Sequence, residues 1–276
     1  MKLEILSARP AGTQRPFNLL FVHGMCVGAW VWSPHFLPCF AEWGYAAHAL
    51  SLRGHGRSPG AERIGWYSLA DYATDVDDAL KELNGPTILI GHSLGGAVVQ
   101  EYMRRSGGKA AGMVLMASVP PYGLTPAIWR MFFENPALWW EMAVLMFAGA
   151  RRVHQRTVRE GLFSPGFPDQ DFRHFVQEAG NESWVVGMEL MGWRPFAPLP
   201  NTLPHVLVIG AAGDRFVPVS EVRLTAAWYG TEAVILPDTA HAIMLEPRWQ
   251  HAAHAIHAWL EKLEGRLSAP SPVSAP

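Results

Sequence analysis

The stretch TILIGHSLGGAVV, residues 87 to 99, decides the fold of this chain of 276 residues. Residues 87 to 90 are uncharged and mostly apolar, as in a strand that is covered on both faces. An apolar helical run begins at Gly96. The five residues between them, GHSLG, place a glycine two positions to each side of Ser93, which lets a strand and a helix approach closely. The stretch therefore predicts a strand, a sharp turn at Ser93 and a helix.

The same rhythm of a short apolar run followed by an amphipathic run extends over most of the chain. The other strand candidates are residues 17–22, 46–52, 113–117, 206–209 and 233–236. Residues 2–7 are expected to add an antiparallel edge strand, and residues 247–264 a last helix that Gly265 caps. This alternation is typical of an α/β fold, with a mostly parallel sheet flanked by helices.

Residues 119–198 break the alternation. They contain no convincing strand, and prolines interrupt their aromatic-rich helical stretches. The segment is too long for an ordinary loop and too apolar for a linker, so we expect a helical cap inserted over one edge of the sheet. The core then comprises residues 1–118 and 199–264. Residues 265–276 are rich in Ser, Ala and Pro and are expected to be a disordered tail.

Composition excludes several classes of protein. Hydrophobic residues make up 49% of the chain, too many for a disordered protein, and the net charge of -2 argues against a nucleic-acid partner. The longest apolar stretch, 137–150, contains Glu141 and is shorter than the about 20 residues that span a bilayer. Cys26 and Cys39 provide no disulfide framework, so we expect free thiols and a cytoplasmic location. The sequence leaves open whether the protein is a monomer or a homodimer.

The turn at Ser93 indicates a nucleophile. A serine hydroxyl is a weak nucleophile near neutral pH and needs a base, a group that orients the base, and donors for the developing oxyanion. His241 follows the last predicted strand and Asp214 follows the strand 206–209, so both lie at the carboxyl edge where catalytic groups of such sheets collect. The sequence predicts that Ser93, Asp214 and His241 converge there. The alternatives are a glycine-rich turn whose serine caps the helix, a turn-forming Asp214, and His55 as the base.

Two backbone amides are the candidate oxyanion donors. One is the amide of Leu94, which follows the serine, and the other is the amide of Met25 in the loop after the strand 17–22. Cys26, in the same loop, and His92 are expected to line the substrate pocket rather than to react. The predicted cap is rich in Trp, Phe and Met, which favours an apolar lining that suits a hydrophobic substrate. Its candidate substrate-binding residues are Trp129, Trp140 and Trp184.

Taken together, these motifs resemble the α/β-hydrolase superfamily over about residues 17 to 262. The motifs are residues 23–24 (HG), 53–58 (RGHGRS), 91–96 (GHSLGG), 213–218 (GDRFVP), 240–241 (AH) and 246–247 (EP). The resemblance implies an eight-stranded sheet, a capped site, and the catalytic triad Ser93, Asp214 and His241. The loop at Met25 is similar to that of the methyl-esterase and hydroxynitrile-lyase branch. The lyases use a cap lysine, and residues 119–198 contain none, which disfavours lyase chemistry.

The expected function is a serine hydrolase that cleaves carboxylic esters of small to medium hydrophobic substrates through an acyl-enzyme. The partner is then a small-molecule ester, and neither a cofactor nor a metal is implied. The alternatives are an amidase, lactonase, acyltransferase or cofactor-free perhydrolase that uses the same triad. A more distant alternative is a non-catalytic ligand receptor with this fold.

Overall fold

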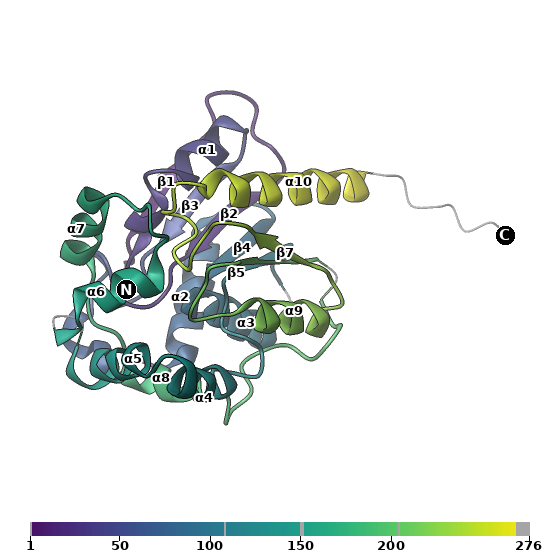
Figure 1. Ribbon diagram of the computed structural model, residues 1–276. Coiled ribbons are helices and arrows are strands. Elements are labelled where there is room, and N and C mark those ends of the chain that lie inside the picture. The colour runs from purple at the N-terminus through teal and green to yellow at the C-terminus, as the bar shows by residue number, and fades with distance from the viewer. Residues whose placement is uncertain (1, 108, 150–151, 204, 269–276) are drawn as a thin grey trace.

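The computed structural model describes residues 2–107, 109–149, 152–203 and 205–268. In this part of the chain, seven strands form one sheet in the order β1-β3-β2-β4-β5-β6-β7 (Figure 1). They are β1 (Ile5–Ala8), β2 (Asn18–Val22), β3 (Ala46–Leu50), β4 (Thr87–His92), β5 (Gly112–Met116), β6 (Val206–Ala211) and β7 (Ala233–Leu236). β1 pairs with β3 in the antiparallel sense, and every other pair is parallel.

The sheet has seven strands within the described residues rather than eight. The count of eight came with the family resemblance, whereas the apolar runs of this sequence number six, plus the expected edge strand near the start. That edge strand forms as β1, and each of the six runs forms a strand within a few residues of its expected bounds. The strands of this chain therefore follow its own hydrophobic pattern.

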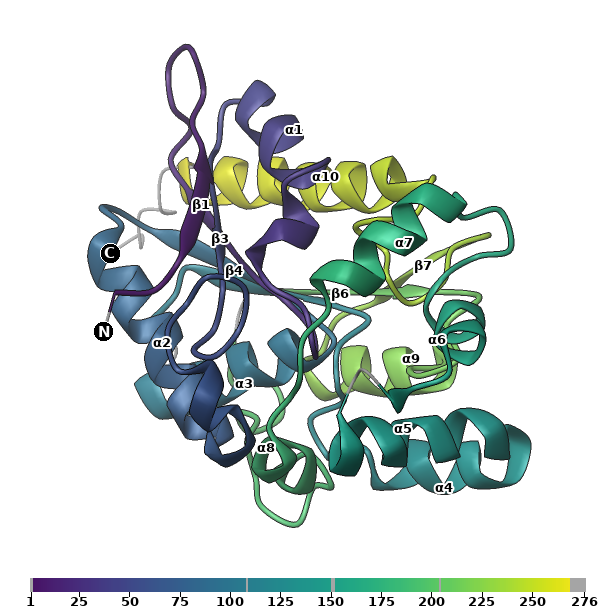
Figure 2. The ribbon, with the colours of Figure 1, turned by 90° about the vertical axis from the view of Figure 1, so that its left-hand side faces the viewer.

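Helices cover both faces of the sheet. α1 (Phe36–Glu42) and α10 (Trp249–Ser268) lie on one face, and α2 (Leu69–Glu82), α3 (Leu94–Ser106) and α9 (Val219–Trp228) on the other (Figures 1 and 2). Two short 3-10 helices, Ala29–Trp32 and Ala61–Trp66, lie in the connections. Because both faces are covered, the parallel strands are mostly apolar instead of alternating between apolar and polar residues.

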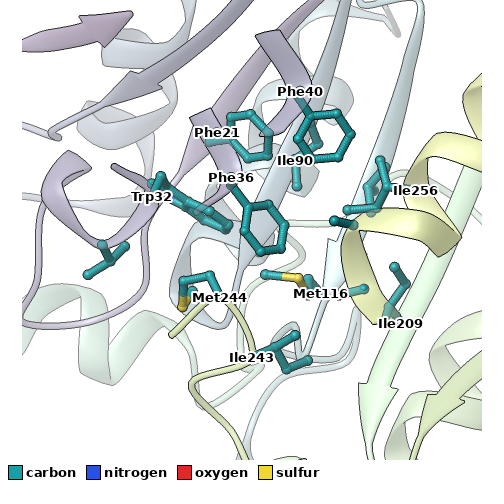
Figure 3. Close-up of a cluster of buried hydrophobic side chains, with 14 of the residues drawn as sticks. Phe21, Trp32, Phe36, Phe40, Ile90, Met116, Ile209, Ile243, Met244 and Ile256 are labelled. Atoms are coloured by element: carbon teal, nitrogen blue, oxygen red, sulfur yellow. The ribbon is translucent and has the colours of Figure 1, made fainter. Parts of the chain in front are cut away.

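Strand β2 shows how the two halves of the core are divided. Leu19 and Phe21 point to the face with α1 and α10, whereas Leu20 and Val22 point to the face with α2, α3 and α9. On the first face, Phe21 meets the ring of Trp32 at 4.9 Å between centroids, within a cluster of aromatic and aliphatic side chains (Figure 3). This packing holds the end of β2, and with it the loop that begins at His23.

The chain between β5 and β6 forms five helices in its described part, which we call the helical segment (residues 119–198). They are α4 (Thr125–Glu134), α5 (Pro136–Ala148), α6 (Gln155–Leu162), α7 (Asp169–Glu178) and α8 (Trp184–Glu189). Pro126 and Pro136 lie in the first turns of α4 and α5, where the missing N–H costs no helical hydrogen bond. These helices lie together to one side of the sheet (Figure 2).

The end of the chain differs from the expectation. α10 continues through Gly265 to Ser268, so Gly265 does not cap it and residues 265–268 are helical. A glycine inside a helix costs only about 0.5–1 kcal/mol, which the packed first part of α10 outweighs. The rest of the expected tail, 269–276, lies outside the described residues. In the part of the chain that the structure describes, no helix is both long enough and apolar enough to cross a membrane.

Candidate active site

Ser93 lies at the sharp turn between β4 and α3. Its backbone has φ 52° and ψ -116°, a conformation that costs free energy in a residue with a Cβ. The flanking glycines explain how the turn fits: a Cβ at Gly91 would collide with the carbonyl oxygen of Gly95, and a Cβ at Gly95 with that of Val22. The Ser93 amide donates to the Met116 carbonyl at 3.1 Å, which fastens the turn to β5. The turn projects the half-buried side chain of Ser93 beyond the end of the strand.

The structure brings Ser93, His241 and Asp214 together. Nε2 of His241 lies 3.0 Å from Oγ of Ser93, and Nδ1 of His241 lies 2.7 Å from Oδ2 of Asp214. The other oxygen of Asp214 accepts the amides of Phe216 and Val217 at 2.8 and 2.9 Å. A carboxylate only accepts hydrogen bonds, so Nδ1 of His241 carries the proton and Nε2 is free to accept the proton of the serine hydroxyl.

His92 packs against His241 and holds its loop through a hydrogen bond. Its Nε2 donates to the backbone carbonyl of His241 at 2.9 Å, and the two ring centroids are 4.9 Å apart. Burial, and next the neighbouring His241, hold the pKa of His92 well below its usual value, so its ring is neutral. His92 adjoins the cavity, and its one hydrogen bond among the described residues is made to the protein backbone.

The loop after β2 passes directly beside the serine. A Cβ at Gly24 would lie 2.9 Å from Nδ1 of His92 and 3.2 Å from Cβ of Ser93, so only glycine fits without displacement. Met25 follows, half-buried at the cavity wall. Across the serine, Leu94 is the first residue of α3, and its amide has no acceptor within the helix. The two amides predicted as oxyanion donors thus belong to the two segments that flank Ser93.

Cys26 also adjoins the cavity, and its buried thiol is not activated as a nucleophile. Burial, and next the Glu182 carboxylate, raise the pKa of Cys26 well above its usual value. A protonated, buried thiol is a poor nucleophile. Among the described residues, no group of three or more His, Cys, Asp or Glu side chains could hold a metal ion.

A cavity of about 560 Å³ adjoins Ser93 and His241. Its wall combines residues at or just after the carboxyl ends of the strands with residues from each of the five helices α4, α5, α6, α7 and α8. The helical segment therefore lies over the carboxyl edge of the sheet. Nearly all of the wall is apolar. Glu141 is the only carboxylate among the described residues that line it, and that carboxylate accepts the amide of His154 at 2.8 Å. The cavity is suited to a neutral, hydrophobic ligand.

Two of the three tryptophans that the sequence predicts as substrate-binding residues do not line the cavity. Trp184 lines the cavity, but Trp129 and Trp140 are 59% and 60% exposed and do not. The residues of α5 that do line it include Trp139, Met142 and Ala143, at the spacing of one helix face. Trp140 follows Trp139 and is therefore turned about 100° away from that face. Composition alone could not select the correct face.

Sequence reasoning also missed a buried carboxylate. Glu182, which precedes α8, accepts the amide of Cys26 at 3.2 Å and lies against His55 and Tyr72. These residues come from distant parts of the chain and form no local pattern. A glutamate in a polar run between two helices gives no signal that it will be buried.

Comparison with known proteins agrees with this architecture. Residues 19–253 match the model of the alpha/beta hydrolase family. A pimeloyl-acyl-carrier-protein methyl ester esterase from Aromatoleum aromaticum is 28% identical over 86% of this chain and 91% of its own length. A monoacylglycerol lipase from Mycolicibacterium smegmatis is 25% identical over 82% of this chain and 81% of its own. A non-heme chloroperoxidase from Kitasatospora aureofaciens is 32% identical, but the match covers only 40% of this chain and 39% of that protein.

Solved structures show the same fold. A putative non-heme bromoperoxidase from Mycobacterium tuberculosis has a TM-score of 0.71 at 18% identity and covers 98% of this chain and 97% of its own. A putative aryl esterase from Burkholderia cenocepacia has a TM-score of 0.68 at 19% identity and covers 95% of this chain and 94% of its own. The resemblance and the α/β fold predicted from the motifs are confirmed. The chain belongs to the alpha/beta hydrolase family.

Proposed function

We propose that this hydrolase cleaves carboxylic esters of small to medium hydrophobic substrates through an acyl-enzyme. The observation that carries the proposal is the continuous hydrogen-bonded line from Ser93 Oγ to His241 Nε2 at 3.0 Å and from His241 Nδ1 to Asp214 Oδ2 at 2.7 Å. The methyl ester esterase and the lipase among the relatives match most of the chain, which supports an ester as the substrate.

In the first half of the reaction, Oγ of Ser93 attacks the ester carbonyl carbon while its proton passes to Nε2 of His241. The Asp214 carboxylate stabilises the imidazolium that forms, and the amides of Met25 and Leu94 donate to the tetrahedral oxyanion. When the carbon–oxygen bond to the alcohol breaks, His241 returns the proton to the departing oxygen. The product is an ester between Ser93 and the substrate's acyl group.

In the second half, water takes the place of the alcohol. Water attacks the acyl carbon while His241 takes one of its protons. The bond between the acyl carbon and Oγ of Ser93 then breaks, His241 returns the proton to Oγ, and the acid is released. The apolar wall of the cavity holds the hydrophobic part of the substrate and reduces water around the reacting atoms.

The test is turnover of a series of p-nitrophenyl esters from acetate to palmitate, by the wild type and by Ser93→Ala. We expect steady turnover by the wild type, with a preference for acyl chains that the cavity accommodates, and loss of turnover in the variant. Ligand binding without turnover by the wild type would instead support a receptor.

A second candidate, perhydrolysis, is favoured by the haloperoxidases among the relatives. In it, hydrogen peroxide replaces water in the second half and releases a peracid. Peracid formation from acetate and peroxide, lost in Ser93→Ala, would support this activity beside ester hydrolysis.

A further inference from the structure

A buried polar cluster outside the candidate triad links the helical segment to the loop beside Ser93. We call it the Glu182 cluster; its members are Glu182, His55 and Tyr72. Their side chains are almost fully buried, with 6%, 3% and 0% of each residue exposed. They come from the chain before α8, from the loop after β3 and from α2. The triad does not use them, and no motif contains all three.

Both oxygens of Glu182 are fully engaged. Oε2 accepts the Cys26 amide at 3.2 Å and lies 3.1 Å from Nε2 of His55. Oε1 accepts the Tyr72 hydroxyl at 2.8 Å and the Ser183 amide at 2.7 Å. A buried carboxylate with four partners has a fixed orientation.

The contact between Glu182 and His55 favours the charged form of each side chain. Burial alone would lower the pKa of His55, but the Glu182 carboxylate outweighs it and the pKa is raised. Burial alone would raise the pKa of Glu182, but His55 and the hydrogen bonds outweigh it and the pKa is lowered. The hydrogen bond from the Cys26 amide is therefore made to a charged acceptor, which is stronger than one to a neutral acceptor.

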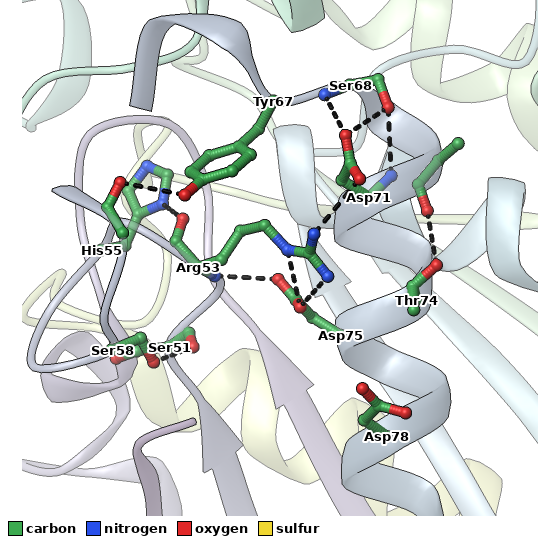
Figure 4. Close-up of polar contacts among 12 residues, drawn as sticks. Ser51, Arg53, His55, Ser58, Tyr67, Ser68, Asp71, Thr74, Asp75 and Asp78 are labelled. Carbon is green, nitrogen blue, oxygen red and sulfur yellow. Dashed lines mark hydrogen bonds and ion pairs between the residues drawn. The ribbon is translucent and has the colours of Figure 1, made fainter. Parts of the chain in front are cut away.

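His55 is itself connected to helix α2 of the hydrolase core through Arg53. Its Nδ1 lies 3.2 Å from the Arg53 carbonyl, and the Arg53 side chain forms ion pairs with Asp71 and Asp75 of α2 (Figure 4). The contact at 2.7 Å between Arg53 and Asp75 is almost fully buried on the Asp75 side. The cluster therefore rests on the hydrolase core on one side and on the helical segment on the other.

The loop that the cluster contacts is strained at Cys26. This residue has φ 63°, which is unusual for a residue with a side chain. Its amide is held by Glu182 at 3.2 Å, and its carbonyl accepts the Gly180 amide at 2.7 Å. The peptide plane that contains the Cys26 amide also contains the carbonyl of Met25. Holding this plane fixes the direction of the backbone at Met25, next to the amide that is to meet the oxyanion.

We propose that Glu182 is a positioning residue of the oxyanion loop: it holds Cys26 in its strained conformation and so aims the Met25 amide at the reacting carbonyl. The inference rests on the proposed function. It makes the helical segment part of the catalytic geometry, because residues 180 and 182 supply both contacts to Cys26. Glu182 acts through the loop and does not touch the substrate.

The first experiment is Glu182→Gln. Glutamine keeps the shape but replaces one acceptor oxygen with an NH₂ donor, which must face either the Cys26 or the Ser183 amide. Loss of one oxyanion donor costs roughly 10²–10³ in kcat, so we expect misalignment to lower kcat about 10- to 100-fold with KM within about twofold. Inhibition by an alkyl trifluoromethyl ketone, which forms a tetrahedral oxyanion on Ser93, should weaken by a similar factor.

Glu189→Gln is the matched control. Glu189 is a second buried carboxylate of the helical segment: it accepts the backbone amide of Leu69 at 2.6 Å and pairs with Arg194 at 3.1 Å. Its side chain is not among the residues that line the cavity, and its hydrogen bonds do not involve the oxyanion loop. We expect its kcat and ketone affinity to stay within about twofold of the wild type. A loss in Glu182→Gln no larger than in Glu189→Gln, or a loss confined to KM, would overturn the proposal.

Tyr72→Phe provides a milder variant in case Glu182→Gln does not fold. It removes only the hydroxyl that donates to Oε1 of Glu182, and we expect a threefold to tenfold loss of kcat with the same loss of ketone affinity. An unchanged kcat and ketone affinity in folded Tyr72→Phe would count against the proposal.

Amide hydrogen exchange separates this inference from the proposed function. Exchange in residues 24–28 of the resting protein should be faster in Glu182→Gln than in the wild type, and unchanged in Glu189→Gln. If the wild type hydrolyses no ester, the proposed function fails, and the exchange rates alone decide whether Glu182 holds the loop. If ester hydrolysis is found but the exchange rates are equal, the inference fails by itself.

Discussion

The sheet edge at Ser93 and the helical segment over it are built in opposite ways. At the edge, short turns carry polar groups whose positions are fixed by backbone hydrogen bonds, such as the two amides that hold Oδ1 of Asp214. In the helical segment, large apolar side chains both line the cavity and lie exposed, as Trp139 and Trp140 do on adjacent positions of α5. We infer that the edge carries the proposed reacting groups, whereas the segment shapes the cavity and contributes to the reaction geometry only through its contacts with Cys26.

The largest effect that tests this comparison is expected from Asp214→Asn. The asparagine fits the same space but can present its NH₂ to His241, which favours the wrong ring tautomer. We expect kcat for a p-nitrophenyl ester to fall roughly 10⁴-fold, equivalent to about 5.5 kcal/mol, with little change in KM. A loss below tenfold in the folded variant would show that Asp214 does not orient the base.

His23, a buried histidine at the sheet edge, predicts that the free energy of unfolding depends on pH. Burial, and next the neighbouring His55, lower the pKa of His23 to about 3. Between about pH 6.5 and 3 the unfolded chain binds a proton at this residue and the folded chain does not, so stability falls as pH falls. His23 contributes up to about 1.4 kcal/mol per pH unit in this window.

Urea unfolding at pH 6.5 and 5.5 checks this prediction with His23→Gln, which removes the titrating ring and keeps a donor and an acceptor. We expect a flatter dependence of the free energy of unfolding on pH than in the wild type. His251→Gln, on the exposed side of α10, is the control and should keep the wild-type slope. Equal slopes in all three proteins would contradict the assignment to His23.

A moderate effect is expected where the helical segment shapes the cavity. Ala143→Phe adds a ring to the wall on α5 and reduces the room for a long acyl chain. We expect kcat/KM for p-nitrophenyl octanoate to fall about tenfold, or about 1.4 kcal/mol, while kcat/KM for the acetate stays within about twofold. A parallel loss for both esters would mean that the substitution disturbs the sheet edge instead.

The smallest effect is expected from Trp140→Ala. This side chain is 60% exposed and lies on the outer face of α5, next to the lining residue Trp139. We expect the acyl-length preference to be unchanged and the free energy of unfolding to shift by no more than about 0.5 kcal/mol. A change of preference like that of Ala143→Phe would show that the outer face takes part in substrate binding.

Local sequence patterns were sufficient to predict the structure where a motif permits only one backbone geometry. Glycines around Ser93 predicted the turn because no other residue fits between β4, α3 and the end of β2. Asp214 and His241 could be placed because the carboxyl ends of parallel strands meet at one edge. Which face of a helix is buried depends on tertiary packing, which is why the sequence alone does not distinguish Trp139, which lines the cavity, from Trp129 and Trp140, which do not.

The amino-acid sequence by itself determined the order of strands and helices, the turn at Ser93 and the edge at which Asp214 and His241 would lie. These features depend on apolar periodicity and on glycine sterics, which act over a few residues. Only the tertiary structure decided which tryptophans face the cavity and that Glu182 meets His55, Tyr72 and Cys26. Such contacts join residues more than a hundred positions apart, and their free energy appears only once the core has brought them together.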